Sequence, residues 1–413
     1  MALSTQPVKG ARDFYPEDKR LQKYLFGVMR SVCERFGYEE YDAPILEPTE
    51  LYLSKGNEEI IQNQTYTFKD RGERSVTLRT EMTPSVSRMV AARRQEAPYP
   101  LRWYSIPQCW RYERMQHGRG REFYQLNVDV FGVPGIEADF EIIQVADAIL
   151  KAFGATPDMY EIRVNSRKEL NKRIDAAGVK TSQAEVTRLI DKFEKLEPNE
   201  FKNMLNTQVN EPEKLFDFLQ SDGASAELKD LMKSAENAGI RVKYVPTIAR
   251  GFDYYTDIVF EVFDTNPENN RSMFGGGRYD GLVSMFGAES LPAAGFAMGD
   301  ITLQNFLETH GLVPELRTES DLYVILMGNV FEAAQKPISQ LREMGLRIAV
   351  DTTGRKADKQ IKSAVKKGIR YGLFIGEKEL TEDQYKLKDL QTGSEETRAL
   401  ERIVSIVKDF RKS

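Results

Sequence analysis

A change of pattern near residue 320 restricts the possible folds of this chain more than any other feature of its sequence. From residue 321 onward, strand-like and helix-like segments alternate in the order β-α-β-α-β, followed by one more strand and a final helix. Because a crossover helix joins two parallel strands, this alternation predicts a small α/β domain on a largely parallel sheet. The polar, proline-containing stretch at 307–320 is typical of a linker. We therefore predict two domains, at 1–320 and 321–413.

The first 320 residues mix strands and helices without such alternation. Residues 16–36 show helical spacing of apolar residues and end at Gly37, and residues 139–154 form a second clear amphipathic helix. Strand signals return at 241–303. Residues 167–240, in contrast, are rich in Lys and Glu and mostly helical in pattern. We expect a first domain of α and β elements that carries a helical insertion at about 167–240.

The composition argues against several classes of protein. No apolar run approaches the roughly 20 residues that span a bilayer, and the N-terminus lacks the apolar core of a signal peptide. We therefore expect a cytoplasmic protein without a membrane partner. Cys33 and Cys109 lie in apolar surroundings typical of core residues in a reducing compartment. With only His117 and His310, a His-based triad or a multi-His metal site is not expected, and we predict no dedicated metal site.

The densest run of polar and aromatic residues lies at 101–132 and has the pattern strand, loop, strand. Because side chains alternate along a strand, Gln125 and Asp129 share one face of the second strand. A face that carries Gln, Asn and Asp is typical of a polar cavity wall. Arg111 ends the first strand, and with the loop arginines it could bind an anionic ligand whose other end contacts Gln125 and Asp129. The cavity face would carry Arg121, Phe123, Gln125, Asn127, Asp129 and Phe131, and the core face Tyr124, Leu126, Val128 and Val130.

Two further segments place polar residues at the start of a helix or a strand. Glu81 and Thr83 stand near a helix start, where they could hold an ammonium group or simply cap the helix. Arg250 and the adjacent Tyr254 and Tyr255 precede an apolar strand. Alternation places the two tyrosines on opposite faces, and a solvated strand end remains the alternative to a binding site.

A glycine-rich segment and a basic segment each allow two interpretations. Residues 274–283 read as a glycine-rich turn that permits either close approach of a ligand or a tight hairpin, and they match neither the dinucleotide fingerprint nor the P-loop. Residues 354–370 hold seven Lys or Arg and one Asp, mostly on one predicted helix. This helix could contact an RNA backbone or simply form a solvated face. The net charge of -5 for the whole chain does not exclude a local basic surface that binds RNA.

Together these segments resemble the class II aminoacyl-tRNA synthetases, and within them the histidyl-tRNA synthetase family, over nearly the whole chain. The stretch from KGARDFYPED to YDAPILEP is similar to the first motif of the class, with Pro44 as the motif proline at a dimer interface. WRYER and GREFYQLNVDVFG are similar to the second motif, and RGFDYYTDIVFE resembles a signature peculiar to the histidine enzymes. GGGRYDGL and GFAMGD follow in the family's order, and the residues from 321 onward resemble its anticodon-binding domain.

The resemblance implies an α+β catalytic core with a mixed, mostly antiparallel sheet, a helical insertion and a C-terminal α/β domain. It also implies a homodimer that uses ATP, bound with Mg²⁺, to activate L-histidine as histidyl-adenylate. The same enzyme would then transfer histidine to the 3′ end of tRNA(His). Attack of a carboxylate on a phosphate needs alignment and charge neutralisation but little proton transfer, which fits a chain with only two histidines.

Carried over by position, the resemblance also implies roles for individual residues. Arg111 and Arg250 would be the catalytic residues at the α-phosphate of ATP, and Arg111 would also bind the substrate carboxylate. Glu81 and Thr83 would hold the α-amino group of histidine. The rest of histidine would be read by Gln125, Asp129, Tyr254 and Tyr255, ATP would be bound by Arg111, Arg119, Arg121 and Arg278, and tRNA by Arg355, Lys356, Lys359 and Lys362.

Three positions depart from the family pattern. The third motif of the family ends in Gly-x-Glu-Arg, whereas Ile301 and Thr302 stand here in place of the Glu and the Arg that contacts the γ-phosphate. In an active enzyme another basic residue, such as Arg278, would cover that phosphate. Thr80 replaces a common Pro, and Asp129 replaces a common Glu.

Two alternatives to an active enzyme follow from these departures. One is a non-catalytic paralogue, such as the regulatory subunit that accompanies ATP phosphoribosyltransferase in histidine biosynthesis. The other is an RNA-binding sensor with an inactive synthetase core. The presence of Arg111, Arg250 and the pair Tyr254 and Tyr255 favours the active enzyme.

Overall fold

The computed structural model describes residues 3–53, 64–113, 118, 120–221, 223–250, 252–269 and 271–412. The chain forms two compact units. The first unit comprises Met1–Phe14 and Gln22–Val313, and the second comprises Tyr15–Leu21 and Pro314–Ser413. The chain passes into the second unit after Val313, within the stretch predicted as a linker. In the part of the chain that the structure describes, every helix is too short or too polar to cross a membrane.

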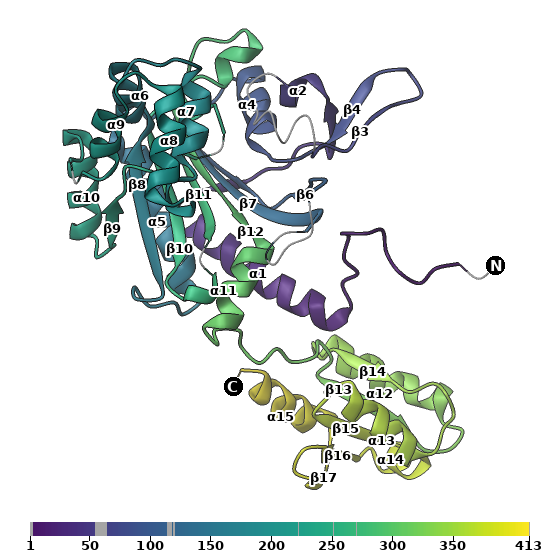
Figure 1. Ribbon diagram of the computed structural model, residues 1–413. Helices are drawn as coiled ribbons and strands as arrows, with labels where there is room; N and C mark the ends of the chain where they lie inside the picture. Colours follow the sequence, from purple (N-terminus) through teal and green to yellow (C-terminus); the bar gives the residue numbers. More distant parts are fainter. Residues whose placement is uncertain are drawn as a thin grey trace. The chain divides into compact units, whose positions relative to one another are not determined.

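A nine-stranded mixed sheet forms the centre of the first unit (Figure 1). Its strands are β1 (Glu39–Glu40), β5 (Leu101–Ser105), β6 (Gln108–Trp110), β7 (Glu122–Phe131), β8 (Tyr160–Ser166), β9 (Val242–Tyr244), β10 (Ile258–Asp264), β11 (Ser272–Arg278) and β12 (Ala293–Gly299). They follow the order β1-β5-β7-β12-β11-β10-β8-β9, with β6 also paired to β7. Neighbours from β5 to β8 are antiparallel, and only the edge strands β1 and β9 pair in parallel. The expected mixed, mostly antiparallel sheet is confirmed.

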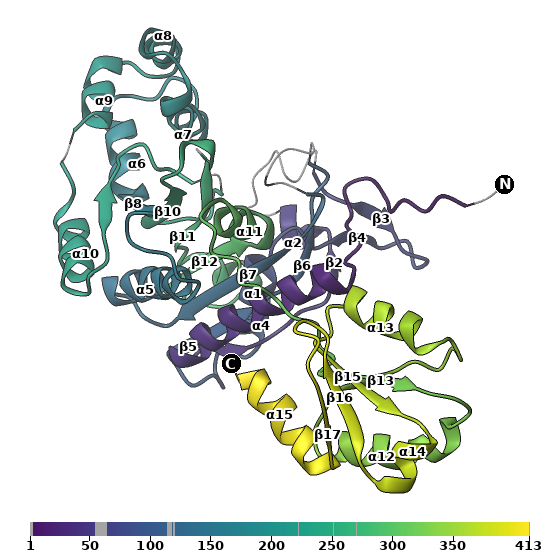
Figure 2. The same ribbon diagram turned by 90° about the horizontal axis from the view of Figure 1, so that it is seen from below.

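Helices α1 (Pro16–Arg35) and α5 (Ile136–Ala152) lie on one face of this sheet (Figure 2). Leu25, Met29 and Val32 of α1 are buried at the helical spacing that the sequence predicted. Tyr124 of β7 packs against Phe26 of α1, with their ring centroids 5.3 Å apart. The core face of β7 is confirmed by the complete burial of Leu126, Val128 and Val130.

Smaller elements complete the first unit. A three-stranded antiparallel sheet has the order β2-β4-β3, formed by β2 (Leu46–Pro48), β3 (Thr67–Lys69) and β4 (Ser75–Leu78). Among the residues that the structure describes, the remaining helices of this unit outside the insertion are α2 (Glu50–Leu53), α4 (Thr83–Ala92), α11 (Asp300–Thr309), η2 (Pro267–Asn269) and η3 (Val283–Phe286). Cys33 and Cys109 are buried as predicted, and burial raises the pKa of each thiol to about 12.

The helical insertion leaves the sheet after β8. It contains α6 (Arg167–Ala176), α7 (Gln183–Ile190), η1 (Phe193–Lys195), α8 (Pro198–Gln208), α9 (Pro212–Leu219) and α10 (Ala226–Asn237). Helices α6 to α9 share a core of their own, which includes Leu170, Val186, Phe201 and Phe216. Helix α10 packs instead against α5 and β9. The predicted insertion is helical throughout, but its last helix covers the sheet, because the chain must return there to pair β9 in parallel with β8.

The predicted glycine-rich turn at 274–283 is wrong, because Gly275, Gly276 and Gly277 lie inside β11. A side chain on Gly276 would collide with the carbonyl oxygen of Gly295 on β12. A side chain on Gly275 would collide with the backbone of β10 and would come 3.1 Å from Nη1 of Arg250. The glycines therefore permit close packing between strands and leave room for the guanidinium of Arg250.

The second unit is an α/β domain with a five-stranded sheet of order β14-β13-β15-β16-β17. Its elements are β13 (Leu322–Leu326), α12 (Phe331–Glu343), β14 (Ile348–Val350), α13 (Ala357–Lys366), β15 (Tyr371–Ile375), α14 (Glu377–Glu382), β16 (Tyr385–Asp389), β17 (Glu395–Arg398) and α15 (Leu400–Lys412). The predicted parallel pairing holds for β14, β13 and β15, whereas β16 and β17 pair antiparallel. Strand β17 was not predicted, because its residues Glu395–Arg398 are polar and largely exposed on the sheet edge.

Candidate active site

A cavity of about 1440 Å³ lies in the first unit on the face of β7 opposite to α1. The residues that line it belong to α4, β7, β10, β11, β12, the segment before β10 and the end of α7, among others. Eight of the residues predicted to bind substrate or to catalyse line it together: Glu81, Thr83, Arg111, Gln125, Asp129, Arg250, Tyr254 and Tyr255. Residues up to about 170 positions apart in the chain therefore share one cavity, as Glu81 and Tyr254 show by a direct hydrogen bond.

Arg111 and Arg250 both act electrostatically on Glu81. Burial raises the pKa of Glu81 above its ordinary value, and the positive charges of Arg111 and Arg250 act in the opposite direction. The hydroxyl of Tyr254 donates to Oε2 of Glu81 over 2.9 Å. Arg111 is held in place by a 2.9 Å bond from its Nε to the carbonyl oxygen of Thr80. The positive charges of two arginines from distant segments thus both act on one buried carboxylate of the cavity.

Thr83 does not cap the helix that it begins. Helix α4 starts at Thr83, and its N-cap is Met82, which makes no side-chain capping bond. Glu81 and Thr83 both line the cavity instead. Of the two interpretations that the sequence left open, N-capping is wrong.

Asp129 is a nearly completely buried carboxylate on the cavity wall, with 2% exposure. Its Oδ1 accepts a very close hydrogen bond from the hydroxyl of Tyr279, whereas Oδ2 has no hydrogen-bond partner among the described residues. Burial raises the pKa of Asp129 to about 7, although Tyr279 and Tyr41 lower it. Gly295 faces this carboxylate, and any side chain there would collide with Oδ1. Tyr279 was not predicted as a site residue, although it stands inside the motif GGGRYDGL.

Arg250 has a left-handed backbone conformation, with φ of 58°. Its Nη1 donates to Oε1 of Glu261 over 2.9 Å, and its Nη2 donates to the carbonyl oxygen of Gly275 over 3.3 Å. Burial alone would lower the pKa of Arg250, but Tyr255 and Glu261 raise it above its ordinary value. Arg250 therefore stays charged, which suits fixed stabilisation of a phosphate.

The predicted alternation of Tyr254 and Tyr255 is wrong. Both tyrosines line the cavity, and their ring centroids are 4.8 Å apart. They precede β10, which begins at Ile258, so that turn geometry and not strand geometry sets their directions.

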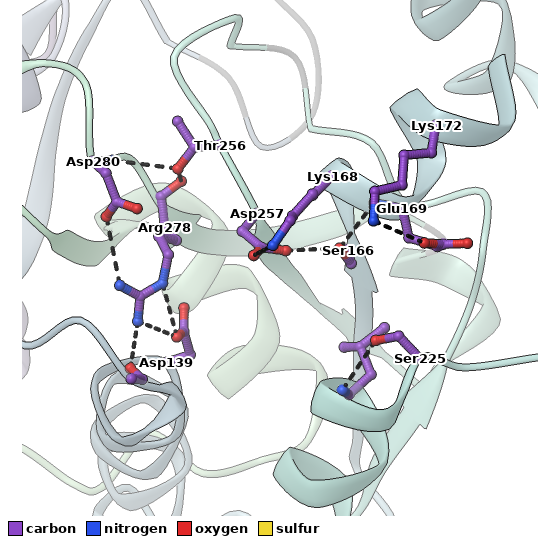
Figure 3. Close-up of polar contacts among 12 residues, drawn as sticks. Asp139, Ser166, Lys168, Glu169, Lys172, Ser225, Thr256, Asp257, Arg278 and Asp280 are labelled. Carbon is purple, nitrogen blue, oxygen red and sulfur yellow. Dashed lines mark hydrogen bonds and ion pairs between the residues drawn. The ribbon is translucent and has the colours of Figure 1, made fainter. Parts of the chain in front are cut away.

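Arg278 points away from the cavity, contrary to prediction. It lies opposite Ala294 in the sheet, and Ala294 lies opposite Val130, so that all three side chains project from the core face. Figure 3 shows its guanidinium bound to Asp139 of α5 and to Asp280. The prediction that Arg278 binds ATP is therefore wrong, because its side chain lies on the opposite face of the sheet from the cavity.

The two loop arginines have different outcomes. Arg119 lies outside the described residues. Arg121 does not line the cavity; its guanidinium stacks 3.7 Å from the ring centroid of Tyr112 and donates to the carbonyl oxygen of Glu113 over 3.3 Å. The backbone N–H of Arg111 donates to the carbonyl oxygen of Arg121 over 2.9 Å, so the two residues are neighbours, but only Arg111 lines the cavity.

The first turn of α11 lines the cavity with Ile301 and Thr302, the positions that depart from the third motif. The hydroxyl of Thr302 donates to the carbonyl oxygen of Met273 over 2.9 Å. Arg271 stands two residues before Met273, is exposed and lines the same cavity. Among the described lining residues the cationic side chains are Arg111, Lys195, Arg250 and Arg271. Arg271 was not predicted as a site residue, because no recognisable motif surrounds it in the sequence.

The predicted tRNA-binding residues belong to the second unit, where Arg355 and Lys356 directly precede α13 and Lys359 and Lys362 lie within it. Lys356, Lys359 and Lys362 are exposed. Arg355 differs, because its Nη2 pairs with Oδ2 of Asp351 at 2.7 Å. The three lysines could contact an anionic backbone directly, whereas Arg355 is partly neutralised.

The cavity combines cationic groups for phosphate or carboxylate, acidic oxygens for an ammonium group, and a buried carboxylate beside phenols. Among the described residues, no group of three or more His, Cys, Asp or Glu could hold a metal ion. This arrangement can align an anionic nucleophile with a phosphate and neutralise their charges without an acid–base residue.

Comparisons with known proteins show which family the chain resembles over its length. Residues 10–302 match the family model of histidyl-tRNA synthetase, and residues 321–410 match that of an anticodon binding domain. The chain is 39% identical to a histidine–tRNA ligase of Leptospira biflexa, over 98% of each chain. The crystal structure of histidyl-tRNA synthetase from Nostoc sp. PCC 7120 is similar with a TM-score of 0.82 at 25% identity, over 99% of this chain and 100% of that one.

A further structure shares the fold at lower identity. The ATP phosphoribosyltransferase regulatory subunit/histidyl-tRNA synthetase from Bacillus halodurans C matches with a TM-score of 0.72 at 22% identity, over 88% of this chain and 97% of that one. This likeness concerns the fold alone. With a family model over most of the first unit and a relative of 39% identity over nearly its whole length, the chain belongs to the histidyl-tRNA synthetase family.

Proposed function

We propose that this protein activates L-histidine with ATP and transfers the histidyl group to the 3′ end of tRNA(His). The observation that carries the proposal is the convergence of Arg111 and Arg250 on one cavity with Glu81 and Asp129. Two fixed cations suit the α-phosphate and the substrate carboxylate, and two carboxylates suit the ammonium group and the ring of histidine.

Histidine would bind with its ammonium group at Glu81 and Thr83 and its ring at Asp129. The unpartnered Oδ2 of Asp129 can accept a hydrogen bond from a ring N–H. Gln125 and Tyr255 line the same cavity and would offer further polar contacts to the ring. A cavity built on these bonds rejects amino acids of similar size that lack a ring N–H, because Oδ2 of Asp129 would then stay buried without a hydrogen-bond partner.

In the first step, a carboxylate oxygen of histidine attacks the α-phosphorus of ATP. The bond from that phosphorus to the bridging oxygen breaks, and pyrophosphate leaves. Arg111 and Arg250 stabilise the charge that develops on the α-phosphate. In the second step, a hydroxyl of the terminal ribose of tRNA attacks the carbonyl carbon, and AMP leaves.

Magnesium would enter with ATP as part of the substrate and neutralise charge on the phosphates. The lining residues Glu113 and Glu268 fit such an ion, because Mg²⁺ usually keeps phosphate and water ligands and needs few carboxylates. Arg271 would contact the terminal phosphate in place of the arginine that Thr302 replaces. This role of Arg271 is supported by its position on the cavity wall, two residues before Met273. The carbonyl oxygen of Met273 accepts the hydrogen bond from the Thr302 hydroxyl.

Lys356, Lys359 and Lys362 on the exposed side of α13 would contact the tRNA backbone. A homodimer would form through the first-motif segment around Pro44, where Ile45 is 38% exposed and Leu46 is 42% exposed. Exposed apolar side chains beside a motif proline fit a subunit contact. The ligase relative, which matches over 98% of both chains, favours the ligase over the regulatory-subunit alternative.

The decisive experiment is exchange of radiolabelled pyrophosphate into ATP, with each of the 20 amino acids in turn. We expect exchange that depends on histidine. The variant Arg250→Ala should lose exchange by at least about a hundredfold but keep histidine binding, because Arg250 acts on the phosphate. If none of the 20 amino acids supported exchange, or if several supported it equally well, the proposed function would be contradicted.

A further inference from the structure

The root of the helical insertion contacts the segment that carries Arg250. The side-chain amide of Asn165, at the end of β8, donates to the carbonyl oxygens of Pro246 and Ile248 over 2.9 Å each. The hydroxyl of Ser166 donates to Oδ1 of Asp257 over 2.7 Å. It also accepts from the backbone N–H of Glu169 over 3.1 Å and so caps α6 (Figure 3). Three consecutive residues at 165–167 thus hold the segment 246–257 near both of its ends.

Arg167 makes the contacts nearest to the reacting centre. Its Nη1 donates to the carbonyl oxygen of Ala249 over 2.5 Å and to that of Arg250 over 3.1 Å. Its backbone N–H donates to the carbonyl oxygen of Asp257 over 2.9 Å. Arg167 is 6% exposed and does not line the cavity, so it acts on the segment and not on a ligand.

The backbone of Arg250 needs such support. The left-handed backbone conformation that Arg250 shows is unfavourable for a residue with a side chain. Strained backbone of this kind persists only where surrounding contacts hold it. On one side, Glu261 and Gly275 fix the guanidinium of Arg250; on the other side, Arg167 fixes its carbonyl oxygen.

We propose that Arg167 is a positioning residue for adenylate formation, which holds Arg250 in its active conformation from the first turn of α6. The proposal rests on the proposed function for its kinetic consequences, but the contact itself can be tested without activity. Arg167 would also couple the insertion to the reacting centre. The insertion lies beside that centre, since its residues Ile190, Asp191 and Lys195 line the same cavity.

The test compares Arg167→Met with Arg173→Met. Arg173 lies on the same helix, pairs with Glu169 at 2.9 Å and contacts no residue of the segment 246–257 in any described ion pair or side-chain hydrogen bond. Arg167→Met should lower kcat of histidine-dependent pyrophosphate exchange at least about tenfold and change KM for histidine by less than about twofold. Arg167→Lys, which keeps a donor and the charge, should recover part of kcat. Arg173→Met should behave like the unaltered protein.

Hydrogen exchange of the full-length protein gives a second readout that needs no activity. The N–H of Thr256 donates to the carbonyl oxygen of Arg278 over 2.8 Å and reports on the segment. Amide hydrogens at 252–257 should exchange faster in Arg167→Met than in the unaltered protein, and their exchange rates should stay unchanged in Arg173→Met. If the unaltered protein lacks histidine-dependent exchange of pyrophosphate, the proposed function fails while this readout still tests the contact. An unchanged kcat in Arg167→Met overturns the proposal, as does a loss of kcat with equal loss of histidine binding and no recovery in Arg167→Lys.

Discussion

Asp129 shows how the surroundings of one residue decide what it can bind. Its position on the cavity face followed from alternation along one strand, but its charge depends on burial and on Tyr279 and Tyr41. With a pKa raised to about 7, the carboxylate is only partly ionised at neutral pH in the ligand-free protein. A histidine ring N–H that binds Oδ2 would favour the ionised form.

The raised pKa of Asp129 predicts a stability effect with a definite sign. Between pH 4 and 7 the folded state holds a proton that the unfolded state has lost, so that stability falls as pH rises through this window. Asp129→Asn removes this titration. Relative to the variant, the unaltered protein should lose up to about 1.4 kcal/mol of unfolding free energy per pH unit there.

Urea unfolding at intervals of half a pH unit measures this difference. The exposed Asp230→Asn serves as the control and should follow the unaltered protein. If the free energy of unfolding varied with pH in the same way for Asp129→Asn and the unaltered protein, Asp129 would already be ionised at low pH and the prediction would fail.

Arg271 carries a second prediction at this scale. Arg271→Met should raise KM for ATP roughly tenfold, equivalent to about 1.4 kcal/mol, and leave KM for histidine unchanged. Adding Thr302→Arg in the same chain should restore KM for ATP, because it returns a cation to the third-motif position. Pyrophosphate exchange at varied ATP measures both, with the exposed Arg241→Met as a charge-matched control. An unchanged KM for ATP in Arg271→Met would remove Arg271 from the phosphate site.

At the scale of elements, strand pairing decided which faces meet. The basic helix at 354–370 was recognised from its charge, and α13 forms there as Ala357–Lys366. The sequence could not show that Arg355 turns back onto Asp351, because that contact depends on the turn after β14. The glycine run was likewise assigned to a turn, because its close contacts lie on neighbouring strands and not in its own segment.

The exposed lysines of α13 predict a salt-dependent contact with tRNA. Replacing Lys356, Lys359 and Lys362 together by Ala should weaken tRNA binding and reduce the slope of log K against log salt by up to about 2–3. A control triple of Lys336, Lys378 and Lys408, exposed on other helices of the same unit, removes the same charge. Filter binding at five salt concentrations measures the slopes. Equal slopes for the two triples would assign the effect to net charge and not to α13.

At the scale of the whole molecule, the two units have separate cores. The first unit holds the cavity and the core around Val259 and Tyr279, and the second holds a core of its own around Val324 and Leu373. Separate cores favour unfolding in more than one step.

Calorimetry should therefore resolve two transitions for the full chain. Histidine and ATP together should raise only the transition of the first unit, by a few degrees, since ligand at 100 times its dissociation constant adds about 2.7 kcal/mol. An RNA hairpin that binds the second unit should raise only the other transition. One cooperative transition shifted by either ligand would show that the two units fold as one.

The sequence by itself determined the two-domain order, the main helices, the helical insertion and the polar face of β7, because these depend on spacing within one segment. It also determined, through matching motifs, which residues to expect in one cavity, and eight of them meet there. Only the tertiary structure decided that Arg278 faces α5, that Tyr279 joins Asp129 and that Arg167 supports Arg250. These contacts join residues 83 to 150 positions apart, and the pairing of strands that brings them together is not encoded in any single segment.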